Sequence, residues 1–83
     1  MTEREKIVKE LIEKVSKAYR KQLEVASDTR TEIYGIDVHL QNKKIPYEDY
    51  MFFASKRREL EKREKEERLL AYGMARAREE LFE

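Results

Sequence analysis

The residue best suited to acid–base or metal chemistry is His39, the only histidine of the chain. A catalytic imidazole needs a nucleophile to activate or a carboxylate to orient it, and a metal site needs several ligands. Asp37 lies two residues away, a spacing that places both side chains on one face of a strand. One such pair is too little for catalysis or metal binding, and we expect His39 to be structural or to face solvent.

Carboxylates are abundant, but in the second half of the chain they alternate with basic residues. The closely spaced ones are Glu64, Glu66, Glu67, Glu79 and Glu80. A general acid needs a poorly solvated pocket that raises its pKa, which a solvated helix face does not supply. The chain has no cysteine and only two glycines, so it lacks thiolate metal ligands and a glycine-rich phosphate loop. We therefore expect no enzyme activity, no metal and no cofactor.

Basic residues form three sets that could contact the phosphates of a nucleic acid. The first set, Lys14, Lys17 and Lys21, shares one face of a helix. The two later sets contain Lys43, Lys44, Lys56, Arg57 and Arg58. Because acidic residues are mixed into the same helices and the net charge is only +1, nucleic-acid binding is the alternative interpretation rather than the first one.

An aromatic cluster over residues 47–53 is the strongest candidate for a protein contact. Tyr, Phe and Met are enriched at the centres of protein interfaces, and one partner helix cannot cover apolar residues that point in several directions. We expect part of the cluster to form a core and part to face a protein partner. The predicted interface residues are Tyr47, Tyr50, Phe52, Phe53, Leu70, Met74 and Leu81.

The first element that must position these residues is a helix over about residues 3–27. Thr2 and Glu5 have the spacing of a capping box at its start. Its apolar stripe is expected to consist of Val8, Leu11, Val15, Ala18 and Val25. The polar run at 27–29 offers local hydrogen bonds that compete with a helix and is expected to end it.

Residues 28–45 are predicted to be an irregular or partly extended connector. Residues 36–41 alternate apolar and polar, as a strand does. They could pair with residues 29–34, pair with another chain, or lie as an extended connector on the helices, and we favour the connector. Thr29 and Glu32 form a second possible capping box, which would start a short turn of helix that Gly35 stops.

A long helix is predicted over about residues 46–82, with Pro46 at its first position. Twelve of the fourteen residues from 55 to 68 are charged, so this stretch is expected to be surrounded by water and to project beyond the contact of the first helix with residues 47–60. A heptad counted from Tyr50 also predicts an antiparallel homodimer through the long helix.

Together these patterns predict a single all-α domain over residues 1–83. So short a chain buries only about 60–65% of its unfolded surface and often gains from a partner. No stretch is apolar enough for a signal peptide or a membrane span, which favours a cytoplasmic protein without membrane contact. We expect a small, regulatory, non-enzymatic protein-binding module (an adaptor, an inhibitor or an assembly factor), with a nucleic-acid-binding accessory protein or a structural coiled-coil dimer as alternatives.

Overall fold

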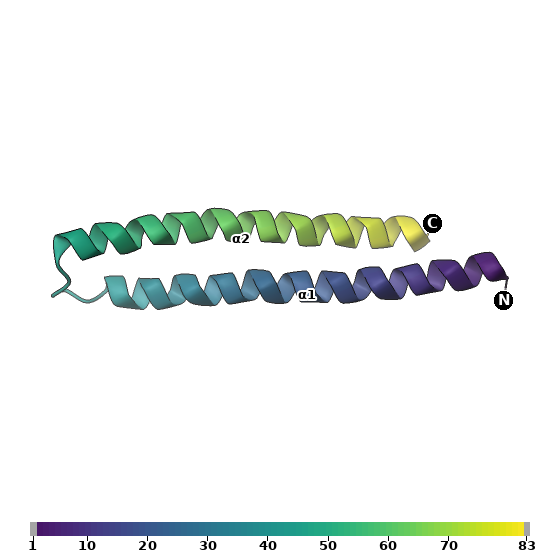
Figure 1. The fold of residues 1–83 in the computed structure, drawn as a ribbon, viewed down its shortest axis with the longest axis horizontal. Helices are drawn as coiled ribbons and strands as arrows, with labels where there is room; N and C mark the ends of the chain where they lie inside the picture. Colours follow the sequence, from purple (N-terminus) through teal and green to yellow (C-terminus); the bar gives the residue numbers. More distant parts are fainter. Residues whose placement is uncertain (1, 83) are drawn as a thin grey trace.

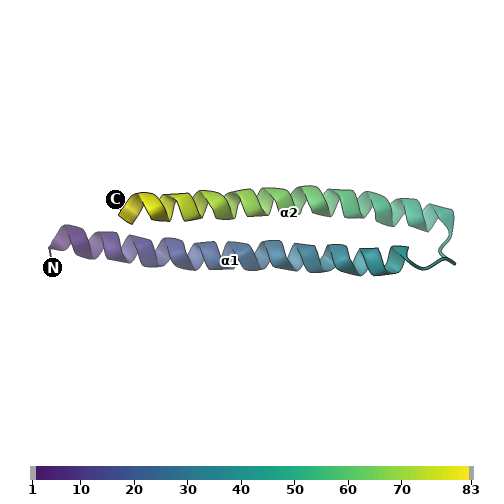
Figure 2. The same ribbon diagram turned by 180° about the vertical axis from the view of Figure 1, so that it is seen from behind.

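The computed structural model describes residues 2–82, which form two long helices joined by a short turn. Helix α1 spans Glu3–Leu40 and helix α2 spans Tyr47–Phe82. The two helices run antiparallel as a hairpin (Figure 1), and the rod measures 66 × 14 × 12 Å. Seen from behind (Figure 2), the beginning of α1 extends past the end of α2. The predicted all-α fold class is confirmed.

The start of α1 is the one that the sequence predicts. Thr2 has extended backbone angles (φ −75°, ψ 160°), and its hydroxyl oxygen accepts a hydrogen bond from the amide of Glu5 at 3.2 Å. This bond satisfies one of the amides that the first turn of a helix leaves without a partner. Glu3 and Glu5 also place negative charge at the positive end of the helix dipole.

The connector expected over residues 28–45 is not what the structure shows, because α1 continues through residue 40. The hydroxyl of Thr29, which was expected to help end the helix, lies 3.2 Å from the carbonyl of Val25 one turn earlier. The hydroxyl of Thr31 lies in the same way 3.1 Å from the carbonyl of Ser27. In this geometry the hydroxyl groups bond to carbonyls of the helix itself and do not interrupt its backbone hydrogen bonds. Residues 36–40 of the alternating stretch therefore belong to a helix, and residues 2–82 contain no strand.

The connection consists only of residues 41–46. The amide of Gln41 donates to the carbonyls of Asp37 (3.2 Å) and Val38 (3.3 Å), which closes α1. The side-chain oxygen of Asn42 then accepts from the amide of Lys44 at 3.0 Å. After Pro46 the long helix begins and continues without interruption to Phe82, as the sequence predicts.

Each helix faces the other with a narrow stripe of residues spaced alternately by four and three. We call the two stripes the interhelical seam. In α1 it contains Val8, Ile12, Val15, Tyr19, Gln22, Ala26, Thr29, Ile33, Ile36 and Leu40. In α2 it contains Phe53, Arg57, Leu60, Glu64, Glu67, Ala71, Met74 and Leu81. Such spacing is that of a coiled coil, and within the described chain the apolar residues that it buries fully are Ala26, Ile33 and Ala71.

The apolar stripe expected for the first helix is only partly correct. Its members at every seventh residue are exposed, namely Leu11, Ala18 and Val25. The set that begins one residue later lies in the seam. Continued past residue 28, the expected set reaches the polar Glu32 and His39, whereas the observed set reaches Ile33 and Leu40. The sequence distinguishes the buried stripe from the exposed one only when the helix is continued to residue 40.

The contact between the helices also differs from the one expected. The side chain of Gln22 donates to the backbone carbonyl of Glu67 at 3.0 Å, so the first part of α1 lies against the last part of α2 and not against residues 47–60. The charged stretch 55–68 lies opposite the second half of α1 and does not project beyond the contact of the two helices, although most of its side chains face water.

Replacing Ile33 by alanine tests this seam, because Ile33 is the largest fully buried apolar side chain among residues 2–82. We expect Ile33→Ala to lower the free energy of unfolding by about 2–4 kcal/mol, measured by urea denaturation followed by circular dichroism. Val38→Ala, at an exposed position of the same helix, should change it by less than about 0.5 kcal/mol. Equal losses in both variants would contradict the assigned seam.

Candidate protein-interaction surface

The middle of the seam is polar and centres on Glu64, whose residue is only 4% exposed. Arg30 of α1 donates two hydrogen bonds to its carboxylate, one of them from Nε at 2.9 Å. Arg68, one turn farther along α2, donates from Nε at 3.2 Å and from Nη2 at 3.0 Å. A buried carboxylate is tolerated only when it is paired and hydrogen-bonded, and Glu64 meets both conditions.

Further polar contacts continue this arrangement along the hairpin. The hydroxyl of Thr29, 2% exposed, lies 2.6 Å from a carboxylate oxygen of Glu67 and shares its single proton between this oxygen and the Val25 carbonyl. The guanidinium of Arg57 pairs with Asp37 on α1 and with Glu61 on α2. We call the contacts of Glu64, Glu67 and Arg57 with α1 the polar ladder.

The ladder changes the protonation of its carboxylates. The hydrogen bond from Arg30 is the largest influence on Glu64 and lowers its pKa, while burial acts in the opposite direction. Arg57 lowers the pKa of Asp37 in the same way, against a smaller effect of desolvation. Both carboxylates therefore stay ionised to lower pH than in an unfolded chain, which suits a structural pairing and not a proton donor.

His39 and Asp37 do not form a pair in the structure. The His39 ring meets the edge of Phe53, with 4.6 Å between ring centroids, while Asp37 pairs with Arg57. Among residues 2–82 no group of three or more His, Asp and Glu side chains is placed to hold a metal ion.

The predicted interface residues divide into two groups. Phe53, Met74 and Leu81 are half-buried in the seam, so they hold the hairpin together. Tyr47, Tyr50, Phe52 and Leu70 are exposed. The first three of these lie at the turn end of the rod, where Phe52 rests edge-on against Phe53 and carries the Lys56 ammonium 5.7 Å from its ring centroid. Leu70 lies near the middle of the rod, one turn beyond Glu67, whose carbonyl meets Gln22 midway along α1.

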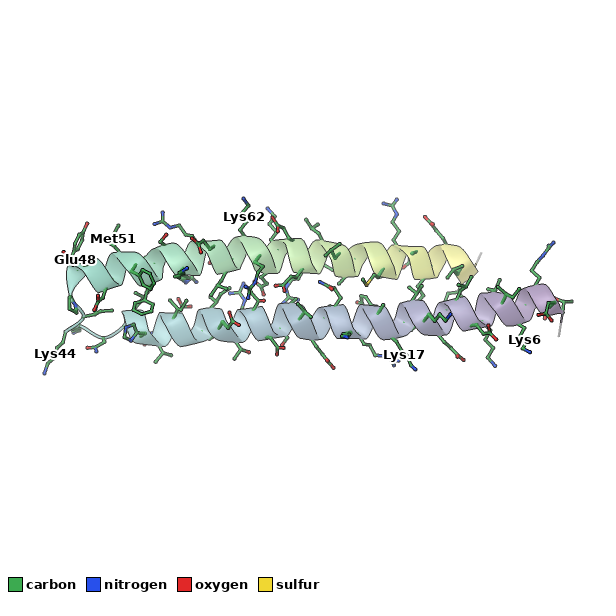
Figure 3. The ribbon with its side chains drawn as sticks, in the orientation of Figure 1. Lys6, Lys17, Lys44, Glu48, Met51 and Lys62 are labelled. Atoms are coloured by element: carbon green, nitrogen blue, oxygen red, sulfur yellow. The ribbon has the colours of Figure 1, made fainter. Side chains whose placement is uncertain are left out.

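The three basic sets are not brought together. Lys14, Lys17 and Lys21 are exposed on α1 far from the turn that carries Lys43 and Lys44, as the positions of Lys17 and Lys44 in Figure 3 show. Lys56 and Arg58 are exposed on α2. Arg57, the middle residue of the third set (Lys56, Arg57 and Arg58), is half-buried in the polar ladder and is therefore not free to contact a phosphate.

Several exposed apolar residues were not among the interface residues that the sequence predicted. They are Ile7, Leu11, Val25, Tyr34, Val38, Met51, Leu69, Tyr72 and Phe82. The signal that could have revealed some of them is the width of the apolar face over residues 8–26. The two stripes of the seam are apolar there, and so is a third stripe beside them, formed by Leu11, Ala18 and Val25. A face this wide is more than a single antiparallel neighbour covers.

Exposed apolar residues of both helices lie on one side of the hairpin, from the middle of the rod toward its open end. We define the terminal face as Leu11, Ala18, Val25, Leu70 and Ala77. Glu32 and Arg63 occupy the equivalent heptad positions of α1 and α2, and their charged groups meet at 3.3 Å. Because positions seven residues apart share a face of a coiled-coil helix, this ion pair places both halves of the terminal face on the same side.

A groove of about 490 Å³ lies where α1 extends past the end of α2. Its apolar lining includes Val8, Ile12, Leu81 and Phe82. The open end of the hairpin thus leaves part of its own seam uncovered.

No helix within residues 2–82 is long and apolar enough to cross a membrane. Comparison of the chain with protein-family models, with curated proteins and with solved structures gives no match. The functional argument therefore rests on the geometry of the hairpin.

Acid titration of stability tests the polar ladder. The pKa of Glu64 is lowered from 4.5 in the folded chain, so its stabilising contribution is complete well above pH 4.5 and is lost as the pH falls through the folded pKa. We expect the free energy of unfolding to fall less between pH 6 and pH 3 in Glu64→Gln than in the unchanged chain. Asp37 supplies part of the remaining slope.

The exposed Glu66 provides the control, since Glu66→Gln also removes one carboxylate from α2 but none from the ladder. If Glu64→Gln kept the full acid dependence, Glu64 would not be ionised and paired in the folded chain.

Proposed function

We propose that this chain is a small non-enzymatic protein-binding module that acts through the surfaces of its helical hairpin. The observation that carries this proposal is the area of its surface. The hairpin exposes 6967 Å², whereas a compact monomer of 10.1 kDa exposes about 5,300 Å². The difference, roughly 1,700 Å², is about twice the 800 Å² that a standard protein interface buries on each partner.

The exposed residues support a protein partner because many of them are large and apolar. Over Leu69–Tyr72 the side chains of α2 point to successive sides of the helix, and every one except the buried Ala71 is large, apolar and about 60% exposed. A helix segment that is apolar on all sides is normally surrounded by other protein. Tyr and Leu at such positions supply contact area without new charged groups to desolvate.

The rod shape favours an adaptor or an assembly factor over the other kinds of module. Two exposed apolar surfaces lie at different levels of the hairpin, the aromatic residues 47–52 at the turn and the terminal face between the middle of the rod and its open end. A rigid two-helix rod holds them at a fixed separation, which would allow one chain to contact two partners or two sites on one partner.

The two alternatives have weaker support. A nucleic-acid-binding protein would use basic sets that lie apart on the rod, and one of its predicted contacts, Arg57, is already paired with two carboxylates. An antiparallel dimer through the long helix would use the heptad that here faces α1, so the hairpin would have to open. Binding to DNA or RNA that weakens steeply with salt would favour the first alternative.

Site-specific photo-crosslinking tests the proposed function. We place a photoreactive amino acid at position 70 or 52, both exposed and apolar, and at position 17 as the control. Lys17 points away from α2 (Figure 3) and its neighbours on the helix surface are charged. In the native host we expect protein adducts at 70 or 52 that an excess of the unlabelled chain displaces, and none at 17. The absence of displaceable protein adducts at both apolar positions would contradict the proposal.

A further inference from the structure

We propose that the terminal face binds the same face of a second copy of the chain, so that two hairpins form a four-helix bundle. This inference rests on the proposed protein-binding function and names its partner. In the bundle, α1 of each hairpin lies over α2 of the other, and both turns are at the same end.

The first argument is the width of the apolar face of α1. Over residues 8–26, α2 covers the two stripes of the seam, and the third stripe, Leu11, Ala18 and Val25, remains exposed beside them. An apolar face three heptad positions wide is typical of a helix that has two neighbours in a bundle. On α2, Leu70 and Ala77 supply the matching stripe.

The second argument is the shape of the face. Alanines occupy its middle, Ala18 on α1 and Ala77 on α2, while the larger Leu11, Val25 and Leu70 surround them. Small residues at the centre let helix axes approach to the 8–10 Å or so that is usual for packed helices. At the side nearer the turn, the Glu32–Arg63 ion pair ends the apolar region. In the proposed bundle two such pairs meet and alternate in sign.

The third argument is charge, and it decides the orientation. On the surface next to the terminal face, α1 carries Lys14 and Lys21, whereas α2 carries Glu66 and Glu80. With both turns at one end, α1 meets α2 of the copy, and Lys14 lies opposite Glu80. With the turns at opposite ends, α1 meets α1, and Lys14 lies close to Lys21 of the copy. Opposite charges favour the first orientation.

One pair at this border is unfavourable. The same register that places Lys14 opposite Glu80 places Asp28 opposite Glu66, and like charges in contact destabilise an interface. Neutralising Asp28 should therefore strengthen the dimer, a response that no interface remote from this border would show.

The surface of the whole hairpin leaves room for this dimer. A standard interface buries about 800 Å² on each partner, roughly half of the surface by which this hairpin exceeds a compact chain of its mass. The other half is available to the turn end and to Leu69 and Tyr72.

Sedimentation equilibrium on the full chain tests the dimer. At 100 µM we expect twice the mass of 10.1 kDa. Leu70→Asp should weaken dimerisation at least about 30-fold, because each dimer contains the substitution twice at a central apolar contact. Leu69→Asp is the matched control. Leu69 is the preceding residue, is equally exposed at 58% against 60%, and points about 100° away from the terminal face; its effect should stay below about 3-fold.

Circular dichroism verifies that both variants keep their helices. A monomeric unchanged chain at 100 µM would overturn the proposal, as would equal dissociation by the two aspartates in chains that remain helical.

Charge reversal tests the orientation. Lys14→Glu should weaken the dimer by about 3- to 10-fold, and Glu80→Lys in the same chain should restore it. Asp28→Asn should strengthen it. If Lys14→Glu strengthened the dimer, α1 would lie against α1, and the proposed pairing of α1 with α2 of the copy would be overturned.

Crosslinking at position 70 separates this inference from the proposed function. An adduct of twice the chain mass supports the dimer. An adduct with a different protein, together with a monomer in sedimentation, overturns the dimer and leaves the protein-binding module intact. The absence of any protein adduct at positions 70 and 52 overturns both.

Discussion

The hairpin depends on a carboxylate that is placed where a coiled coil normally has an apolar residue. Glu64 occupies the centre of the seam, where Arg30 of the other helix and Arg68 of its own helix both donate hydrogen bonds to its carboxylate. A shift of one helix by a heptad would place Leu23 or Asp37 where Arg30 lies. The buried carboxylate would then keep Arg68 alone, and a buried charge that loses a partner is strongly unfavourable. The other contacts of the polar ladder, Thr29 with Glu67 and Asp37 with Arg57, are satisfied by the same register. The ladder therefore selects one alignment, while the few buried apolar residues supply the attraction between the helices.

This division of roles explains why so much apolar surface is left outside. A seam that devotes its middle to charge and hydrogen bonds buries little apolar area, and two helices have no third layer to cover what remains. The apolar residues of the terminal face lie between the middle of the rod and its open end, the aromatic residues 47–52 lie at the turn, and Tyr34 and Val38 are exposed beside the polar ladder. Binding through these exposed residues is consistent with a stable, specific pairing in the seam, and the two tasks use different residues of the same helices.

Sequence reasoning predicted the fold class, the capped start of α1 and the full extent of α2. The heptad counted from Tyr50 matches the side of α2 that faces another helix, although the sequence assigned that side to a second chain. The errors have one cause: Ser, Asp and Thr at 27–29 were interpreted by their local preference for ending helices, and tertiary contacts overrode it. Because the first helix was predicted to end there, Ile33, Ile36 and Leu40 were not assigned to it and could not indicate which apolar stripe is buried. For the same reason Arg30 and Asp37 were not considered as partners for the charged stretch. The location of the terminal face required both helices in register.

Residues 28–40 are helical and lie opposite residues 53–65 in the register that the polar ladder fixes. Spin labels at the exposed positions 31 on α1 and 55, 62 or 69 on α2 measure this register directly in samples diluted with unlabelled chain. We expect the pair 31–62 to give the shortest distance, with a narrow distribution. The pairs 31–55 and 31–69 should both be longer, because each is displaced by about 10 Å along the rod. A shortest distance for another pair, or broad distributions for all three, would contradict a continuous α1 held in register by Glu64.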